Sequence, residues 1–374
     1  MGDLRNLALT GAVVVAMATA MVFPAAAKDT GLVFVSSEKD NAVHVLDGKT
    51  LEVVKRIGTA ARPRHLQFDP ARTRIFVACG DGDAIDIIDI ATLQLTDRIT
   101  GIDDPELFDF SADGGTLFIS LEDDAKLGIL DLETYFRERE AKPDLDVAEP
   151  SDEPLADEED EEEEESENEE EGEEEEDVAG LTTIEVGAEP EGILANPNGQ
   201  TVYVSSEVAN LVHVVDLASG SIRANILVGQ RPRRFALTPD GRELWVSNEL
   251  AASVSIIDVA SNTVSATLQL EPPRGLRAED VTPVGITMTA DGKTAVVAMG
   301  RANHVAFVDV AARQVTDLVL VGNRAWNATL NRDGSLLYVA NGLSDDMTVI
   351  DMEGRRAVRS VPVGRVPHTV LIDD

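Results

Sequence analysis

A short sequence unit recurs along this chain about every 42 residues, and this repeat constrains the fold more than any other feature. Its clearest copies are Val186-Gly187-Ala188-Glu189-Pro190, Val228-Gly229-Gln230-Arg231-Pro232 and Val363-Gly364-Arg365-Val366-Pro367. Looser copies begin at Gly58, Gly101 and Gly322, and a copy with a longer approach ends at Pro283. Self-similarity at such a period is typical of propellers and solenoids.

Each repeat unit is predicted to contain four short strands. An apolar run and an Asp-Gly turn, as in Thr238-Pro239-Asp240-Gly241, mark a hairpin after the proline. Aromatic and β-branched residues follow, as in Tyr203-Val204-Ser205-Ser206, and suit a buried strand. A third strand ends in Asp, as in Ile256-Ile257-Asp258, and a fourth leads to the next Val-Gly. Four antiparallel strands with no helical pattern between them predict propeller blades.

The number of third strands predicts an all-β, seven-bladed β-propeller. The folded part begins with a second strand near Gly31 and ends with a first strand that starts at Pro367. These two strands are therefore expected to complete one blade and close the ring, which would pair edges that are otherwise open.

The N-terminal region is predicted to be a cleaved signal peptide covering residues 1–27. It combines Arg5, an apolar stretch over residues 7–23 and the small residues Ala25, Ala26 and Ala27. A membrane anchor is the alternative, but the uninterrupted apolar run is short compared with the roughly 18 residues of a spanning helix. We therefore expect a periplasmic protein whose residues 28–374 form one propeller, with no membrane span after cleavage.

Most of the charge is concentrated in one segment. Residues 144–177 contain 23 Asp or Glu and no Lys or Arg, so the rest of the chain carries −15 of the formal charge of −38. We predict that residues 134–180 form a disordered acidic insert, placed between a third strand (127–132) and a fourth (181–186) on the face opposite the channel mouth. It is interpreted either as a solubilising loop or as a means of attracting a basic protein such as a cytochrome c. A body this acidic argues against nucleic-acid binding.

Candidate ligand-binding residues follow the proline of each repeat, where the inner strand is expected to start at the mouth of the channel. The residue type at these positions differs between repeats while the neighbouring residues recur, so a local requirement rather than the repeated fold determines each of them. The candidates are Arg64, His65, Glu106, Glu191, Arg233, Arg234, Trp326, Asn327 and His368. The three arginines suit a multiply charged anion, because guanidinium groups bind carboxylates in bidentate fashion. The alternative is a polar, water-filled channel entrance.

A second set of candidates closes the second strands. Glu38, Glu122, Glu207 and Glu249 occupy equivalent places in four repeats. Carboxylates that converge on one face are suitable ligands for Ca²⁺, although solvated loop residues are the alternative. The longer connection 271–280, which contains Arg274 and Arg277, is predicted to be a lid over the same face.

The repeats resemble those of the YVTN-repeat β-propellers, and the order of blades behind a leader looks like the periplasmic family associated with PQQ-dependent alcohol catabolism. The resemblance covers nearly the whole chain after the leader. It implies a companion role beside a quinoprotein dehydrogenase and cytochromes, with no agreed catalytic residues to transfer. The acidic insert departs from the family pattern.

Three functional hypotheses remain open from the sequence. Motifs for covalent haem, a Gly-x-Ser-x-Gly nucleophile and a phosphate loop are all absent from the sequence. The first hypothesis is a non-catalytic binding propeller that serves a quinoprotein and cytochrome system and takes a PQQ-like anion or a partner's loop. The second is a lactonase-like hydrolase that uses a metal such as Ca²⁺. The third is a propeller resembling the nitrite-reductase haem d1 domain, with non-covalent haem held by His65 or His368.

Overall fold

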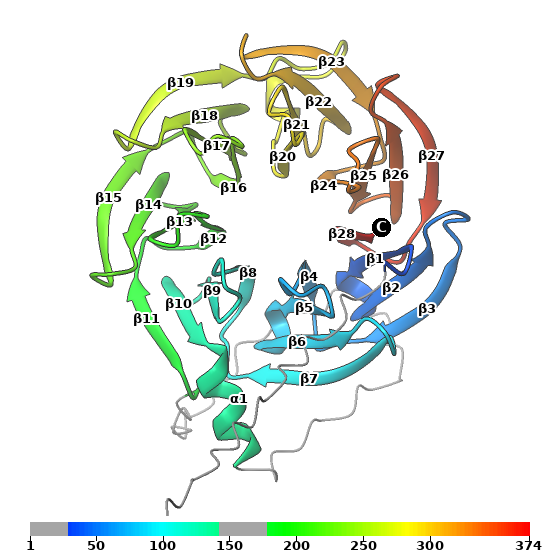
Figure 1. The fold of residues 1–374 in the computed structure, drawn as a ribbon. Coiled ribbons are helices and arrows are strands. Elements are labelled where there is room, and N and C mark those ends of the chain that lie inside the picture. Colours follow the sequence, from blue (N-terminus) through cyan, green and yellow to red (C-terminus); the bar gives the residue numbers. More distant parts are fainter. Residues whose placement is uncertain (1–28, 142–177) are drawn as a thin grey trace, which may run out of the picture.

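The structure, a computed structural model, describes residues 29–141 and 178–374. These residues form a ring of seven four-stranded antiparallel sheets (Figure 1). The predicted seven-bladed propeller is therefore confirmed. The predicted signal peptide and residues 142–177 of the predicted insert lie outside the described residues.

Each blade is numbered along the chain, and its strands are given from the innermost to the outermost. Blade 1 contains β28 (Pro367–Asp373), β1 (Leu32–Ser37), β2 (Ala42–Asp47) and β3 (Val53–Gly58), and blade 2 contains β4 (Pro63–Phe68), β5 (Arg74–Cys79), β6 (Ala84–Asp89) and β7 (Gln94–Thr100). Blade 3 contains β8 (Pro105–Phe110), β9 (Thr116–Leu121), β10 (Lys126–Asp131) and β11 (Leu181–Glu185), and blade 4 contains β12 (Pro190–Ala195), β13 (Thr201–Ser206), β14 (Leu211–Asp216) and β15 (Ser221–Leu227). Blade 5 contains β16 (Pro232–Leu237), β17 (Glu243–Asn248), β18 (Ser253–Asp258) and β19 (Thr263–Gln269), and blade 6 contains β20 (Ile286–Met288), β21 (Thr294–Ala298), β22 (His304–Asp309) and β23 (Gln314–Leu320). Blade 7 contains β24 (Ala325–Leu330), β25 (Leu336–Asn341), β26 (Asp346–Asp351) and β27 (Arg356–Pro362).

Pairing of the two ends of the chain closes the ring. Strands β1 and β28 are antiparallel neighbours, with Leu32 opposite Asp373 and Val33 opposite Ile372. The backbone N–H and the hydroxyl of Thr30 both donate to the Asp373 carboxylate, at 2.8 and 2.7 Å. The predicted closure of one blade by both ends is confirmed, and it joins segments that are more than 300 residues apart.

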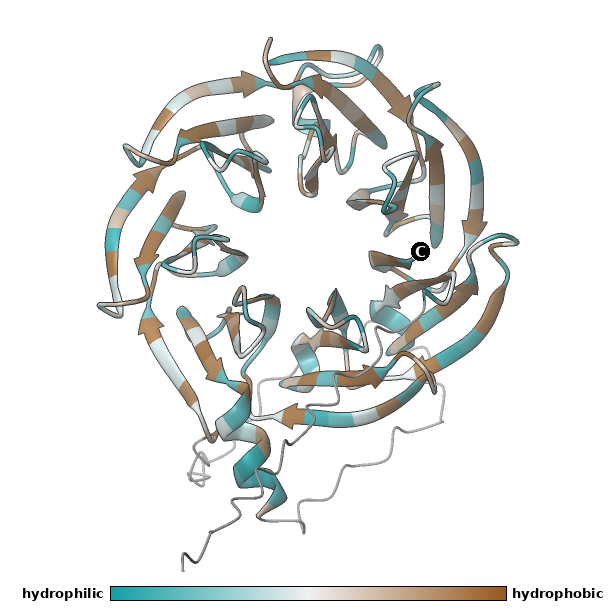
Figure 2. Cartoon of the chain, viewed as in Figure 1, coloured by the Kyte–Doolittle hydropathy of each residue, from teal (hydrophilic) through white to brown (hydrophobic). Residues whose placement is uncertain are grey.

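The hydrophobic core lies between neighbouring blades. Trp245 of blade 5, for example, is fully buried in a cluster with Ile286 and Val297 of blade 6. The outermost strand β19 alternates exposed and partly buried side chains, and bands of different hydropathy along the outer strands are visible in Figure 2. Each blade therefore depends on its neighbours for the burial of its apolar faces.

Repeated turns on one face of the ring hold the connections between blades. This face, called the mouth face below, carries the turns between second and third strands and the connections that lead into each inner strand. The fourth residue of each turn has a positive φ, in Asn41, Asp83, Ala125, Asn210, Ala252, Asn303 and Asp345. In five blades its side-chain oxygen accepts a hydrogen bond from the backbone N–H of a residue that precedes an inner strand, namely Arg62, Asp104, Arg231, Arg324 and Val366. The repeat thus positions several charged residues beside the channel.

A helix that the sequence analysis did not anticipate begins the insert. Helix α1 (Leu132–Glu140) follows β10, and the Asp131 side chain caps it by accepting from the Thr134 N–H. Tyr135 and Phe136 pack against the core between blades 2 and 3. The prediction of disorder is therefore wrong for residues 134–140, because the Tyr135 and Phe136 side chains gain burial against blades 2 and 3. No helix in the described part of the chain has the length and hydropathy needed to cross a membrane.

Candidate functional site

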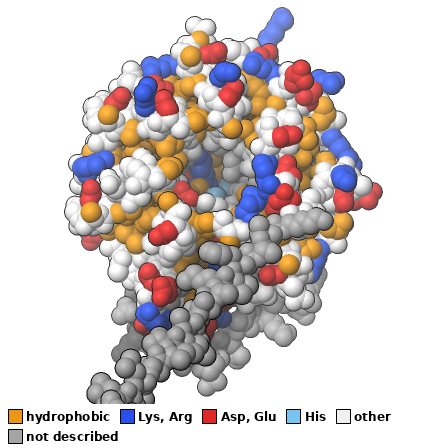
Figure 3. All heavy atoms as spheres, in the orientation of Figure 1, with side chains coloured by type: hydrophobic (Ala, Val, Ile, Leu, Met, Phe, Trp, Pro, Cys, Tyr) orange, Lys and Arg blue, Asp and Glu red, His pale blue; other side chains and the backbone are white. Residues whose placement is uncertain are grey.

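The predicted mouth residues lie on a β-bulge that recurs in six of the seven blades. The register between inner and second strands shifts at the two residues after the first residue of the inner strand, as at Arg64 and His65 in blade 2. The same shift occurs in blades 1, 3, 4, 5 and 7. A bulge places two residues opposite one and re-aims their side chains. Figure 3 shows a hollow at the centre of the ring, in which basic, acidic and histidine side chains are visible.

A buried serine stabilises this bulge in four blades and links it to the next blade. In blade 4 the Gly192 N–H donates to Ser205 Oγ at 2.7 Å, and Ser205 Oγ donates to the Arg233 carbonyl of blade 5 at 2.9 Å. Ser36, Ser120 and Ser247 make the equivalent pairs of contacts. The inner strands are therefore held to one another by side-chain hydrogen bonds as well as by packing.

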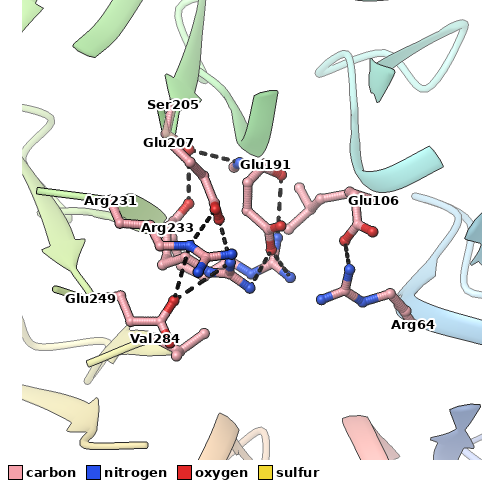
Figure 4. Close-up of polar contacts among 12 residues, drawn as sticks. Arg64, Glu106, Glu191, Ser205, Glu207, Arg231, Arg233, Glu249 and Val284 are labelled. Atoms are coloured by element: carbon pink, nitrogen blue, oxygen red, sulfur yellow. Dashed lines mark hydrogen bonds and ion pairs between the residues drawn. The ribbon is translucent and has the colours of Figure 1, made fainter. Parts of the chain in front are cut away.

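Arg233 is the centre of a buried ion-pair network. Its guanidinium contacts Glu207, lies 3.2 Å from Glu191 Oε1 and 3.6 Å from Glu249 Oε2 (Figure 4). Arg234 also pairs with Glu191, at 2.8 Å. These side chains are all less than 8 % exposed. Burial alone would raise the pKa of Glu191, but Arg233, Arg234 and Arg64 outweigh it and lower that pKa, so Glu191 is ionised.

Arg64 anchors a second group of charges on the blade 2 and blade 3 side of the channel. It contacts Glu106, and its Nε lies 3.7 Å from Glu38 Oε1. Arg62, which precedes the same inner strand, lies 2.8 Å from Glu106 Oε1 and 3.1 Å from Asp104 Oδ1. Burial alone would lower the pKa of Arg64, but the carboxylates of Glu106, Glu191 and Glu38 outweigh this effect and raise that pKa above its usual value, so this arginine stays charged.

His368 and Trp326 form the less charged side of the site. Their ring centroids are 5.5 Å apart, and Arg324 lies over the Trp326 ring at 4.3 Å. His368 is 1 % exposed, and its Nδ1 lies 3.0 Å from Thr369 Oγ1. Burial, reinforced by Arg64 and Arg234, holds its pKa well below the usual range, so the ring is neutral. Its Nε2 has no hydrogen-bond partner among the described residues.

The two remaining mouth candidates contact their neighbours. His65 packs edge-on against Phe108, with ring centroids 4.8 Å apart, and burial followed by Arg234 lowers its pKa to about 3. Asn327 accepts from the Ala328 N–H at 2.9 Å. His65 and His368 are near enough to influence each other's charge.

The four glutamates predicted as metal ligands do not form one carboxylate cluster. Glu207 and Glu249 are both held by Arg231 and Arg233, whereas Glu38 faces Arg64. Glu122 instead joins Asp104 and Glu106, whose carboxylate oxygens all lie within 4.8 Å of one another. Burial and the neighbouring carboxylates raise the pKa of Glu122 to about 9 and that of Asp104 to about 6.

The predicted lid lies on the mouth face between blades 5 and 6. It contains a short 3₁₀ turn (Ala278–Asp280), and Arg277 pairs with Asp280 at 3.1 Å. The buried residues Leu270 and Val281 fix its two ends. Arg274 and Arg277 are exposed, so neither contributes to the buried network.

Sequence reasoning missed the charged residues that precede the inner strands. Arg62, Asp104, Arg231 and Arg324 all take part in the networks described above, with positive φ values between 30° and 56°. All four occupy the position directly before an inner strand, where the residue type differs between repeats. The same kind of variation identified the mouth residues. The repeated serines were visible too, but only the structure shows that they link adjacent blades.

Comparisons with known proteins support the fold. The YNCE-like beta-propeller family model matches residues 5–132, and the model of lactonase, a 7-bladed beta-propeller, matches residues 175–273 and 223–358. No curated protein matches the chain significantly.

Solved structures share the architecture at low sequence identity. Hydrazine synthase of Kuenenia stuttgartiensis is 19 % identical with a TM-score of 0.68, over 87 % of this chain and 93 % of that one. A functionally unknown protein from Desulfotomaculum acetoxidans is 14 % identical with a TM-score of 0.69, over 92 % and 99 %. The dihydro-heme d1 dehydrogenase NirN, in complex with DHE, is 16 % identical with a TM-score of 0.63, over 92 % of this chain and 76 % of that one. Together with the repeats and the closed ring, these matches identify the chain as a seven-bladed β-propeller similar to the YNCE-like and lactonase-type propellers.

Proposed function

We propose that the protein is a non-catalytic, ligand-binding propeller of the periplasm, accessory to a quinoprotein and cytochrome redox system. One observation supports the binding site: His368 Nε2 is buried and has no hydrogen-bond partner in the described part of the chain, although charged groups around it are paired with one another. Buried polar atoms are normally hydrogen-bonded, so an atom without a protein partner is a position at which a ligand could bind. The predicted leader and the resemblance to PQQ-associated propellers support the periplasmic redox setting.

The chemistry around His368 favours a planar, anionic ligand. The neutral imidazole offers Nε2, the Trp326 ring lies alongside, and Arg64 Nε and Arg233 Nε have no hydrogen-bond acceptor in the described chain. A PQQ-like quinone would place its carboxylates at these donors. A haem would take His368 as an axial ligand, because Thr369 already orients the other ring nitrogen, as is usual for metal-bound histidine.

Purification from the native periplasm without added cofactor tests this site. We expect mass analysis to find a stoichiometric small molecule in the purified protein. Its absorbance spectrum should show either a quinone band or a Soret band, which identifies its chemical class. The His368→Ala variant should lose the molecule, whereas His304→Ala, at the start of a third strand, should retain it. Colourless and empty wild-type protein would contradict the proposal.

The acidic segment suggests a partner on the other face. Strands β10 and β11, which flank it, are joined on the face opposite the mouth. We propose that its charge attracts a basic cytochrome c or a quinoprotein dehydrogenase, because a dense negative potential raises encounter rates.

The carboxylates of Asp104, Glu106 and Glu122 favour a second candidate function, a metal-dependent hydrolase acting on sugar-derived lactones. Three oxygen ligands within 4.8 Å suit Ca²⁺. This cluster lies in blade 3 and its preceding connection, outside the residues matched by the lactonase model, and Arg62 and Arg64 already offset part of its charge.

The pH dependence of Ca²⁺ binding tests the second candidate. Because the pKa of Glu122 is raised to about 9, a proton must leave before it ligates, so affinity should rise with pH toward that value. Calorimetry should show this rise in wild type and its loss in Glu122→Gln, together with loss of lactone hydrolysis. Asp240→Asn, on the opposite face, is the control. Absence of Ca²⁺ binding across the pH range would exclude this function.

A further inference from the structure

The connection 186–189, which joins blade 3 to blade 4, is held by four hydrogen bonds, and one of them goes to a buried histidine. The Gly187 N–H donates to His213 Nε2 at 3.0 Å, and His213, on β14, is 3 % exposed. The other three bonds go to groups that do not titrate near neutral pH, namely the Ala125 carbonyl, the Ser206 hydroxyl and the Glu207 backbone N–H. Of these four partners, His213 is therefore the one whose hydrogen bonding depends on pH.

The geometry fixes which ring nitrogen of His213 carries the proton. A backbone N–H can only donate, so Nε2 must be unprotonated to accept from Gly187. The proton then lies on Nδ1, which is 2.7 Å from Asn225 Oδ1 on β15. Protonation of Nε2 would place two donors against each other with no acceptor between them. The neutral form of His213 is therefore the form that holds the connection.

His213 and the connection also pack closely. A Cβ at Gly187 would lie 2.9 Å from His213 Nε2 and would overlap Ser206 Oγ. Because the Gly187 nitrogen and Nε2 are only 3.0 Å apart, no bridging water fits between them. A protonated ring and the connection would have to separate.

The equivalent positions of blades 1 and 2 do not have this property. Asp86 is also the third residue of a third strand, and it accepts from the Ala60 N–H at 2.8 Å. A carboxyl group keeps an acceptor oxygen in either protonation state. His44 occupies this position in blade 1, but its Nε2 lies 3.0 Å from Asp40 Oδ2, to which a protonated ring can still donate. Among these three residues, only His213 loses its partner on protonation.

His213 has no ion-pair partner among the described residues that would stabilise a charged ring. Charged residues on the elements around it include Lys126, Glu185, Glu189, Glu191, Glu207 and Arg223. Burial lowers the pKa of His213, and the hydrogen bond to Asn225 opposes this effect only in part. The closed connection is thus compatible with a neutral ring and unfavourable for a charged one.

We propose that His213 is a pH-sensitive positioning residue of the mouth face: its neutral form holds the connection 186–189, and protonation of Nε2 releases the connection and displaces Glu191. Glu191 lies on β12, two residues after the connection, and pairs with Arg233 and Arg234 at 3.2 and 2.8 Å (Figure 4). Movement of the connection would draw this carboxylate away from both arginines. The proposal rests on the contacts of His213 and does not require the proposed ligand.

Opening of the connection should become easier as the pH falls. In the closed state burial holds the pKa of His213 below its ordinary value of 6.5, whereas in the open state the ring is solvated and its pKa returns towards that value. The open state therefore binds the proton more strongly, and below about pH 6.5 its population rises by up to about tenfold per pH unit. Above this range the ring is neutral in both states, so the dependence on His213 disappears.

Hydrogen exchange of the purified protein, followed by mass spectrometry of peptides covering residues 181–195, tests the proposal. Protection is compared after correction for the intrinsic exchange rate at each pH. Wild type should lose about tenfold in protection between pH 7.5 and pH 5.0. His213→Gln offers Oε1 as an acceptor that does not titrate and should stay protected at both values. His213→Leu has no acceptor and should be weakly protected at both, with circular dichroism confirming that each variant is folded.

His44→Gln is the matched control, because His44 occupies the equivalent position of blade 1, and it should leave the response of residues 181–195 unchanged. An equal loss of protection in wild type and His213→Gln would overturn the proposal and assign the response to another group, such as Glu207, whose pKa is raised to about 7. Wild type that is equally protected at both pH values would also overturn it.

Nitrogen-15 magnetic resonance of the histidine side chains provides a second test. At pH 7.5 the signal that is absent from His213→Gln should show a proton on Nδ1 and none on Nε2. The opposite tautomer, or a charged ring at this pH, would contradict the proposal.

Discussion

Replacing Arg233 with alanine is expected to lower the free energy of unfolding by about 3–5 kcal/mol, the usual cost of breaking a buried ion pair from one side. Its side chain is 4 % exposed and contacts Glu191, Glu207 and Glu249. Without it, the Glu207 and Glu191 carboxylates would lose their main compensating charge while remaining buried. Denaturation in urea, followed by circular dichroism, measures the change.

The control for Arg233 lies in the same blade. Arg242 has an 83 % exposed side chain, so Arg242→Ala should change stability by less than about 0.5 kcal/mol. The loss in Arg233→Ala should be smaller at acidic pH, because protonation neutralises the stranded carboxylates, and Glu207 already has a pKa raised to about 7 by burial and by Glu191. A loss below about 1 kcal/mol at neutral pH would show that these glutamates are effectively solvated.

Gly192→Ala is expected to destabilise the propeller by about 1–3 kcal/mol, the range for overpacking a close contact. A Cβ at this position would overlap the Arg233 carbonyl oxygen and lie 2.7 Å from Ser205 Oγ. Both atoms belong to the link between blades 4 and 5, so relief requires the two inner strands to separate. The shift would also move Arg233 and weaken ligand retention at the mouth.

Gly115→Ala is the matched control for Gly192→Ala. Gly115 lies in the turn between the first two strands of blade 3, and the nearest atom to its added Cβ is Asp113 Oδ1 at 3.6 Å. Thermal unfolding should show little change for Gly115→Ala and a clear decrease for Gly192→Ala. Equal behaviour of the two variants would mean that the inner strands are not tightly coupled.

The two proposed binding regions lie on different faces of the ring. The ligand site lies near the mouth, whereas strands β10 and β11, which flank the acidic segment, are joined on the opposite face, where a basic partner would approach.

Repetition in the sequence determined the architecture. Hairpin turns, aromatic second strands and terminal aspartates are local signals, so seven blades and the pairing of both chain ends followed from them. The variable position after each proline led to Arg64, Glu106, Glu191, Arg233, Arg234 and His368, and the structure places all six as buried side chains.

Tertiary structure alone decided how these residues combine. The predicted anion site of three arginines became a network in which Glu106, Glu191 and Glu207 already pair with those arginines, and the four predicted glutamate ligands separated into different groups. Such pairings depend on the bulge in each inner strand and on contacts between blades about 42 residues apart, which no local pattern encodes. Helix α1 forms because Tyr135 and Phe136 reach the core between blades 2 and 3, a gain in burial that is available only once these two blades have packed together.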